Sequence, residues 1–435
     1  MTKKSAIVAS ALCCLAGQIY FASPAHAIPA FARQYKAECK TCHTVFPERN
    51  DFGEAFEKNS FVWPGMKAPG ANDREGMGTS KEWLHLANLM ENIPISFIVD
   101  HSMTYNKDKK PIIDLDADTG FETFTAGAFR DVAGFWAEYS FTDKEVGEAY
   151  IQFRHPFNLP LNLKVGRFQP KLSLWKSNNH PGINDLTYNA MSVGDNAFAI
   201  GSEQGGIELN SVITPYLFAA TGITNSPNSN NRNGKDWYGH ISVRVGGTDF
   251  LGNEPDIDLD HDSIWDNLSL TFGGFGYVGA SDAATSTVNS TATVTDINGN
   301  PVTVTTQSDV QTVPQNDYYR AGLEAEALYK RLRVKLGAVY GKDNHPNIGS
   351  TAAEKSLYFL AQGEYLLGSN VLVTMRYEHQ DVENDHITRI YAPTVAWTPW
   401  QNIRLALEYD QVRTTSVNGD ASTDREGIAQ VSFSY

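Results

Sequence analysis

The stretch Leu332-Arg333-Val334-Lys335-Leu336-Gly337-Ala338-Val339-Tyr340 places an apolar side chain at every second position, with two basic residues in between. Successive side chains of a strand point to opposite faces, so this pattern predicts a β-strand with one apolar and one polar face. The same alternation recurs at 371–378 and at 403–410. We therefore expect the chain from residue 92 onward to be mainly β.

Alternation alone does not separate a soluble β-sandwich from a membrane barrel, because both contain strands with one apolar face. The expected strands run for about ten to thirteen residues, whereas soluble strands average about five or six and membrane strands need about nine to eleven. Short turns alternate with long polar loops, as in outer-membrane barrels. The final alternating segment, Ala429, Val431, Phe433 and Tyr435, resembles the terminal strand by which such barrels are recognised for assembly. Together these features favour the barrel.

The sequence predicts an outer-membrane antiparallel β-barrel of about sixteen strands, an even number that places both chain ends on the periplasmic side. The strands are expected to begin near Ile93, Phe121, Gly134, Glu145, Leu159, Gly205, Pro215, Trp237, Leu268, Tyr318, Leu332, Leu357, Val371, Ile387, Gln401 and Glu426. Long outer loops are expected near 170–203, 225–235, 281–316, 343–354 and 415–425. One connection, 248–263, lies on the short-turn side and is nevertheless long.

Residues 1–27 have the three parts of a secretory signal peptide. Lys3 and Lys4 form a basic start, 5–21 is an apolar run, and Ala25-His26-Ala27 is a cleavage site of the small-x-small type. The mature chain has no run of about 18 uncharged apolar residues, so no transmembrane helix is expected.

Three parts are therefore expected: the leader at 1–27, a monohaem cytochrome c segment at 28–91 and the barrel at 92–435. Removal of the leader also removes Cys13 and Cys14, which leaves two cysteines and no structural disulfide framework.

The two remaining cysteines belong to Cys39-Lys40-Thr41-Cys42-His43, which has the spacing of a covalent c-type haem attachment site. Each thiol would bond one vinyl group of the haem, and His43 would be the proximal ligand of its iron. The alternatives are a redox-active disulfide, which needs a βαβ context, and a zinc half-site, which needs two further ligands. The segment 28–91 is expected to be α-helical, with Phe52 and Phe56 on one helix face, where they could cover a haem edge, take part in ordinary apolar packing, or do both.

The second axial ligand of the iron is less defined. Met66 lies in the irregular segment 63–70, which can direct a thioether towards iron, and it is the candidate distal ligand. A methionine would raise the reduction potential relative to a histidine. The other candidates that follow the haem motif are Met77, Met90, His85 and His101. An open or water-bound iron is a further alternative.

The formal net charge is −15, or −17 without the leader, which carries two lysines and no acid. This balance argues against nucleic acid and favours cations or a basic protein as partners. Four aspartates occupy the long connection on the short-turn side: Asp256, Asp258, Asp260 and Asp262. They form either a solvated turn or a docking patch for a basic periplasmic electron carrier. Three others are expected in a solvated first outer loop, because they match a calcium loop poorly: Asp114, Asp116 and Asp118.

The run from Phe31-Ala32-Arg33-Gln34 through the haem motif to Phe46-Pro47, Asn50, Phe52-Gly53 and Phe56 resembles the fused outer-membrane monohaem cytochrome–porins of iron-oxidising bacteria. The order of leader, single haem motif and barrel also matches that family. The resemblance implies an iron(II)-oxidising oxidoreductase that passes electrons from extracellular Fe(II) to a periplasmic carrier, either a cytochrome or a cupredoxin. Only Cys39, Cys42 and His43 match the family's functional residues.

Distance constrains where the haem can lie. A bilayer core is about 30 Å thick, so a haem below the membrane lies too far from an extracellular donor for tunnelling. A barrel of about sixteen strands encloses a lumen wide enough for a plug. We therefore expect segment 28–91 to fold into the lumen of a barrel surrounded by outer-membrane lipid. Two alternatives stay open: electron export to an extracellular acceptor, and a solute-transport porin with a structural haem plug.

Overall fold

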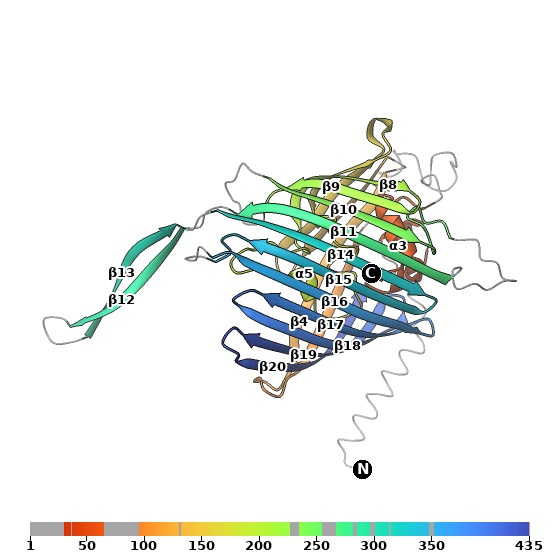
Figure 1. The fold of residues 1–435 in the computed structure, drawn as a ribbon. Helices are drawn as coiled ribbons and strands as arrows, with labels where there is room; N and C mark the ends of the chain where they lie inside the picture. The colour runs from red at the N-terminus through yellow and green to blue at the C-terminus, as the bar shows by residue number, and fades with distance from the viewer. Residues whose placement is uncertain are drawn as a thin grey trace, which may run out of the picture.

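The computed structural model describes residues 30–35, 37–64, 95–129, 132–226, 235–254, 267–281, 285–295, 301–312, 315–347 and 352–434. Sixteen of its strands form one closed barrel in which every described neighbouring pair is antiparallel (Figure 1). The barrel strands are β3 (Ile95–Tyr105), β4 (Ile113–Phe129), β5 (Ala133–Ser140), β6 (Glu145–Arg154), β7 (Asn162–Phe168), β8 (Gln204–Thr214), β9 (Leu217–Thr224), β10 (Asp236–Val245), β11 (Leu268–Ser281), β14 (Asn316–Tyr329), β15 (Leu332–Asp343), β16 (Glu354–Leu367), β17 (Val371–Val382), β18 (His386–Trp400), β19 (Ile403–Ser416) and β20 (Ala421–Ser434). The predicted closed barrel and its strand number are confirmed.

The barrel has a polar interior and an apolar exterior. In the stretch that predicted the fold, Lys335 points into the lumen and is 1% exposed, whereas Leu336 points outward and is 44% exposed. The same arrangement holds around the wall: charged residues are buried inside the barrel, and Ile, Leu, Val and aromatic residues are exposed on its outside. A soluble sandwich buries its apolar faces, so this arrangement is that of a membrane-spanning barrel.

The two rims of the barrel differ. β3 begins and β20 ends at the rim with the short turns, and barrels of this type turn that rim to the periplasm. At the opposite rim, a separate hairpin of β12 (Thr285–Thr295) and β13 (Pro301–Thr312) projects away from the wall (Figure 1). It lies within the predicted outer loop at 281–316.

The first outer loop is shorter than predicted. β4 begins at Ile113 rather than near Phe121, so Asp114, Asp116 and Asp118 lie in a strand and not in a loop. Pairing continues past an irregularity in the register, with Asp118 opposite Ser102 before it and Asp114 opposite Thr104 after it. Aspartate is poorly represented in strands, and the alternating pattern therefore ended too early in the sequence prediction.

The connection 169–203, which was expected to be an outer loop, folds into the lumen. It consists of irregular chain and one short helix, α5 (Thr187–Ala190). Its apolar side chains are almost fully buried: Leu172, Leu186, Tyr188, Met191, Val193, Phe198 and Ile200. Backbone N–H groups of the same loop donate to inward carboxylates of the wall, for example Ile183 to Glu408 at 3.0 Å and Tyr188 to Glu378 at 2.7 Å. Buried apolar groups and satisfied backbone together hold the loop inside.

The described part of the N-terminal segment, residues 30–35 and 37–64, also lies inside the barrel and contains less helix than expected. It consists of α2 (Ala30–Tyr35), the 3₁₀ turn η1 (Cys39–Thr41), β1 (His43–Val45), β2 (Glu48–Arg49) and α3 (Asp51–Lys58). β1 and β2 pair as a small hairpin directly after the Cys-x-x-Cys-His motif, in place of continuous helix. In Figure 1, α3 lies behind the front strands, in the space that the barrel wall encloses. None of the described helices is long and apolar enough to cross a membrane.

Candidate functional site

Cys39 and Cys42 lie on either side of a tight turn at the short-turn rim. In η1 the N–H of Cys42 donates to the carbonyl of Cys39 at 3.1 Å. Both thiols are free and partly exposed. The N–H of Cys39 donates to the side-chain oxygen of Gln401, in the turn between β18 and β19, at 3.5 Å. The motif therefore lies close to the rim that we assign to the periplasm, lower in the barrel than the lumen position expected from the sequence.

His43 follows on β1 with its ring oriented by the backbone. Its Nδ1 atom lies 3.0 Å from the carbonyl oxygen of Pro47. Burial, reinforced by the nearby Arg49 guanidinium, lowers the pKa of His43 to about 4, so the imidazole is neutral at pH 7. A neutral ring that donates from Nδ1 keeps its lone pair on Nε2, the form in which histidine ligates a metal.

Asn50 holds the Cys-x-x-Cys-His motif against helix α3. Its side-chain amide donates to the carbonyls of Lys40 and Thr41 at 3.2 and 3.1 Å. The side-chain oxygen of Asn50 caps α3 by accepting the N–H of Gly53 at 2.9 Å. A Cβ added at Gly53 would lie only 2.2 Å from the carbonyl oxygen of Cys42. The helix and the motif can approach this closely only because residue 53 is a glycine.

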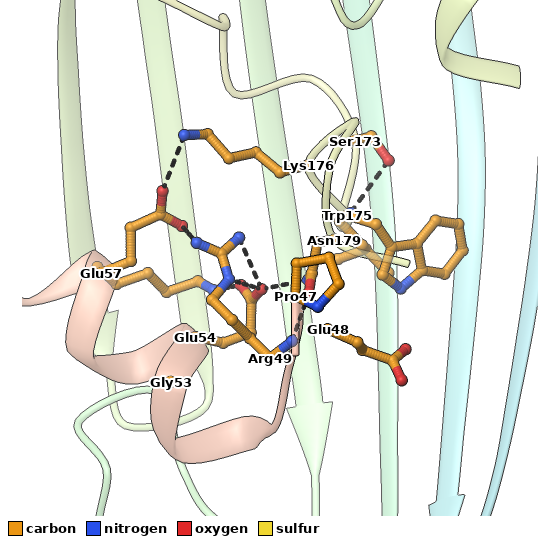
Figure 2. Close-up of polar contacts among 12 residues, drawn as sticks. Pro47, Glu48, Arg49, Gly53, Glu54, Glu57, Ser173, Trp175, Lys176 and Asn179 are labelled. Carbon is orange, nitrogen blue, oxygen red and sulfur yellow. Dashed lines mark hydrogen bonds and ion pairs between the residues drawn. The ribbon is translucent and has the colours of Figure 1, made fainter. Parts of the chain in front are cut away.

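Three buried charges attach the hairpin and α3 to the wall and to each other. Glu48, fully buried, forms ion pairs with Arg333 at 2.9 Å and with Lys335 of β15. Arg49 bonds Glu54 at 3.1 Å and Glu57 at 3.0 Å within the segment (Figure 2). A third pair joins the start of α3 to β10, where Asp51 lies 3.2 Å from Arg244. Buried charges tolerate loss of solvent only when they are paired, and these pairs fix the orientation of the segment.

The inward loop meets this segment in the lumen. The side-chain oxygen of Asn179 accepts the N–H of Arg49 at 2.5 Å, and its amide donates to Glu54 at 2.9 Å (Figure 2). Lys176 lies 3.6 Å from Glu57. The loop enters from one rim and the segment from the other, and the two contact each other inside the barrel.

Aromatic side chains form the apolar side of the segment. The Phe52 ring packs on Trp63 with centroids 5.0 Å apart, and Phe56 packs edge-on against Phe31 at 5.1 Å. Phe61 continues the cluster to Trp136 of the wall at 6.0 Å. Of the two predicted roles for Phe52 and Phe56, the described contacts are those of ordinary packing.

Several features that the sequence predicts lie outside the described residues. They are the leader 1–27, the candidate ligands Met66, Met77, His85 and Met90, and the four aspartates Asp256, Asp258, Asp260 and Asp262. His101 is described, and the structure does not place it beside the Cys-x-x-Cys-His motif. It lies on β3 at an outward position, with its ring 2.8 Å from the Thr119 hydroxyl.

The sequence prediction missed two parts of the site. Asn179 and Lys176 come from a loop that was expected outside the barrel, and no local pattern marks them. Arg333 and Lys335 were assigned correctly to the polar face of a strand, but their partner Glu48 lies almost 300 residues earlier in the chain. Periodicity shows which face a residue occupies and not which residue it meets.

No protein-family model and no curated protein matches this chain. Among solved structures, it is similar to an anion-selective porin from Comamonas acidovorans, with a TM-score of 0.52, 11% identity, and coverage of 78% of this chain and 98% of the porin. It is also similar to the outer membrane channel DcaP of Acinetobacter baumannii, with a TM-score of 0.50, 12% identity, and coverage of 78% and 96%. At this identity the likeness establishes the fold: a closed antiparallel barrel of the outer-membrane porin type.

Proposed function

We propose that the protein transfers electrons at the outer membrane through one c-type haem attached to Cys39 and Cys42, with His43 as proximal ligand. The observation that carries the proposal is the contact between Nδ1 of His43 and the Pro47 carbonyl. A ligating histidine nearly always donates its second ring N–H to a nearby acceptor. Two free thiols on the preceding turn complete the residues needed for covalent attachment. When bound, the haem supplies one-electron exchange at this rim.

The electron donor in this proposal is extracellular Fe(II), and the acceptor is a periplasmic cytochrome or cupredoxin. Each Fe(II) loses one electron to become Fe(III), and the carrier gains that electron, so the protein acts as an iron(II)-oxidising oxidoreductase. Because the motif lies near the periplasmic rim, the electron-transfer distance from the haem to a periplasmic carrier would be short. The opposite rim lies about 30 Å away, too far for direct tunnelling, so in this proposal Fe(II) enters the lumen from that rim. The net charge of −15 favours the approach of a cation there. Met66 stays the proposed distal ligand.

The same site supports electron flow in the reverse direction, from the periplasm to an extracellular acceptor. The relative reduction potentials of haem, donor and acceptor decide the direction. A haem potential above that of the Fe(III)/Fe(II) couple at the working pH supports iron oxidation, and a much lower potential supports export.

A second candidate is a solute-transport porin in which the haem is a structural plug. The fold comparisons favour this candidate more directly than the first, since both similar structures are described as a porin or a channel. Against open passage, Asn179 of the inward loop bonds Arg49 and Glu54 of the segment in the lumen. The two candidates therefore predict different ion conductance.

The test uses the full-length protein, expressed with export and haem maturation and purified in detergent. The proposal expects covalent haem by the pyridine haemochrome spectrum, loss of that haem in Cys39→Ser with Cys42→Ser, and reduction of the haem by anaerobic Fe(II). In planar bilayers it expects low conductance. Absence of covalent haem refutes the electron-transfer proposal outright. A haem that Fe(II) does not reduce, in a barrel that conducts ions freely, supports the porin.

A further inference from the structure

Two arginines lie directly opposite each other on the outward face of the barrel. Arg389 of β18 pairs in register with Arg413 of β19. Both lie close to the long-loop end of their strands, each as the fourth residue from that end. Their outward direction follows from the alternation, because the adjacent Ile390 is 9% exposed and lines the interior beside Tyr188. The pair thus faces the lipid at the rim opposite the haem motif.

The neighbouring strands place a histidine and a further arginine beside the pair. His379 of β17 is opposite Arg389, and Arg425 of β20 is opposite Gln411, the next outward residue below Arg413. Figure 1 shows these strands side by side in the same part of the wall. In the described part of the chain neither Arg389 nor Arg413 has an ion-pair partner. Like charges directly opposite each other on adjacent strands repel and are destabilising. A bound anion would relieve the repulsion between these two arginines.

Aromatic side chains lie one step deeper on the same face. Tyr391 follows Arg389 along β18 and packs against Tyr377 of β17 with ring centroids 5.0 Å apart. Tyr409 of β19 is also exposed, at 43%. An aromatic row at this depth marks the boundary between headgroups and acyl chains. The arginines above it therefore lie at the level of the lipid headgroups.

The opposite rim of the same strands carries no such charges. The corresponding outward row is Val371, Trp397, Leu405 and Val431, each in register with the next. A cationic row that served only to anchor strand ends in any bilayer would be expected at both rims. Here it occurs on one side, and that side faces the outer leaflet.

We propose that Arg389 and Arg413 bind a phosphate of lipid A, the phosphorylated glycolipid of the outer leaflet, with its acyl chains against Tyr377, Tyr391 and Tyr409. Directly opposite strand residues have Cβ atoms about 4.5–5.5 Å apart, so two guanidinium groups can grip one phosphate from both sides. Arginine suits this role because its planar fork of donors matches phosphate oxygens bidentately. The site is separate from the haem motif and depends only on the outer-membrane location.

A second cationic pair, Lys342 opposite Lys355, also faces outward. Lys355 already lies 3.6 Å from Glu383, so its charge is partly compensated. The arginine pair, which has no such partner, therefore carries the proposal.

The test measures binding of diphosphorylated lipid A, fully dephosphorylated lipid A and phosphatidylglycerol to the full-length protein in neutral detergent. Arg389→Gln with Arg413→Gln is expected to weaken binding of diphosphorylated lipid A at least about tenfold, because charge-assisted hydrogen bonds to phosphate are lost. The matched control, Lys330→Gln with Arg331→Gln in a turn at the other rim, is expected to bind as the unaltered protein does. Binding is also expected to weaken as salt increases.

Three outcomes would overturn the proposal. The first is an arginine variant that binds diphosphorylated lipid A as tightly as the unaltered protein. The second is equal binding of phosphatidylglycerol, which would indicate a site for any anionic lipid. The third is dissociation of an oligomer in the arginine variant alone, which would make the pair a contact between copies. If the variant does not fold, the comparison of phosphorylated with dephosphorylated lipid A on the unaltered protein decides. None of these outcomes depends on the haem.

Discussion

Nδ1 of His43 lies 3.0 Å from the carbonyl oxygen of Pro47, and both residues belong to the small hairpin inside the barrel. The ring is thereby oriented by the protein backbone, and its Nε2 atom is left with the lone pair that the proposed iron ligation requires. Since Glu48 follows Pro47 directly and is paired with Lys335 of the wall, the barrel holds the acceptor in place. The wall of the barrel and the proposed iron ligand are thus joined through one short stretch of chain.

Gly53→Ala is expected to separate helix α3 from the haem motif. The added Cβ would lie 2.2 Å from the Cys42 carbonyl oxygen, and a backbone atom cannot yield as a flexible side chain does. Overpacking of this kind costs about 1–3 kcal/mol. The measurements are the thermal midpoint and the amount of covalent haem per chain. Gly363→Ala is the matched control, because its Cβ meets nothing within 4 Å. Equal loss in both variants would contradict the close approach.

Glu48→Gln is expected to loosen the segment from the wall. The substitution leaves Arg333 and Lys335 without the carboxylate that they share, although Lys335 keeps Glu364 at 3.0 Å. Removing one partner of a buried ion pair costs roughly 3–5 kcal/mol, and the remaining partner favours the lower end.

The readout for Glu48→Gln is hydrogen exchange of residues 43–58 in detergent, compared with the barrel strands. Faster exchange confined to the segment is the expected result. Glu38→Gln serves as control, because the Glu38–Lys40 pair is exposed and such pairs add little. Unchanged exchange in Glu48→Gln would show that the ion pairs do not hold the segment.

Acid is expected to release the segment before it unfolds the barrel. Burial alone would raise the pKa of Glu54, but Arg49 and Lys58 outweigh it and lower this pKa to about 2, from an ordinary value of 4.5. A depressed folded-state pKa contributes stability that is complete above about pH 4.5 and is lost as the pH falls towards 2. Protease sensitivity of 48–58 should therefore rise across this range, and Glu54→Gln should make it less dependent on pH. A pH-independent sensitivity in the unaltered protein would refute this.

The sequence predicted the wall of this protein better than its interior. Alternation in 332–340 was enough to assign Lys335 to the lumen and Leu336 to the lipid, because strand geometry imposes a period of two on every strand. The pattern does not reveal where a strand ends, as β4 shows, because a strand that continues beyond the membrane has no apolar alternation there. The haem site at 39–43 stays a prediction, which rests on the residue spacing that covalent attachment requires.

The inward loop could not be predicted in the same way. Its position depends on carboxylates such as Glu378 and Glu408, which lie about two hundred residues later in the chain, so no local pattern reveals it. Asn179 is an ordinary loop residue in the sequence. It becomes part of the site only because the closed barrel brings the loop and the N-terminal segment together.

That contact leads to the prediction that best separates the two candidate functions. Asn179→Ala removes the acceptor of the Arg49 N–H and a donor to Glu54, hydrogen bonds that together contribute about 1–3 kcal/mol. Asn184→Ala is the matched control, because Asn184 belongs to the same loop and bonds Asp410 of the wall instead. In planar bilayers the unaltered protein should conduct little, Asn179→Ala should show more frequent openings, and Asn184→Ala should not. If the unaltered protein already conducts like an open pore, and Asn179→Ala changes nothing, then the loop and the segment do not close the lumen, and the solute-transport candidate gains the support that the electron-transfer proposal loses.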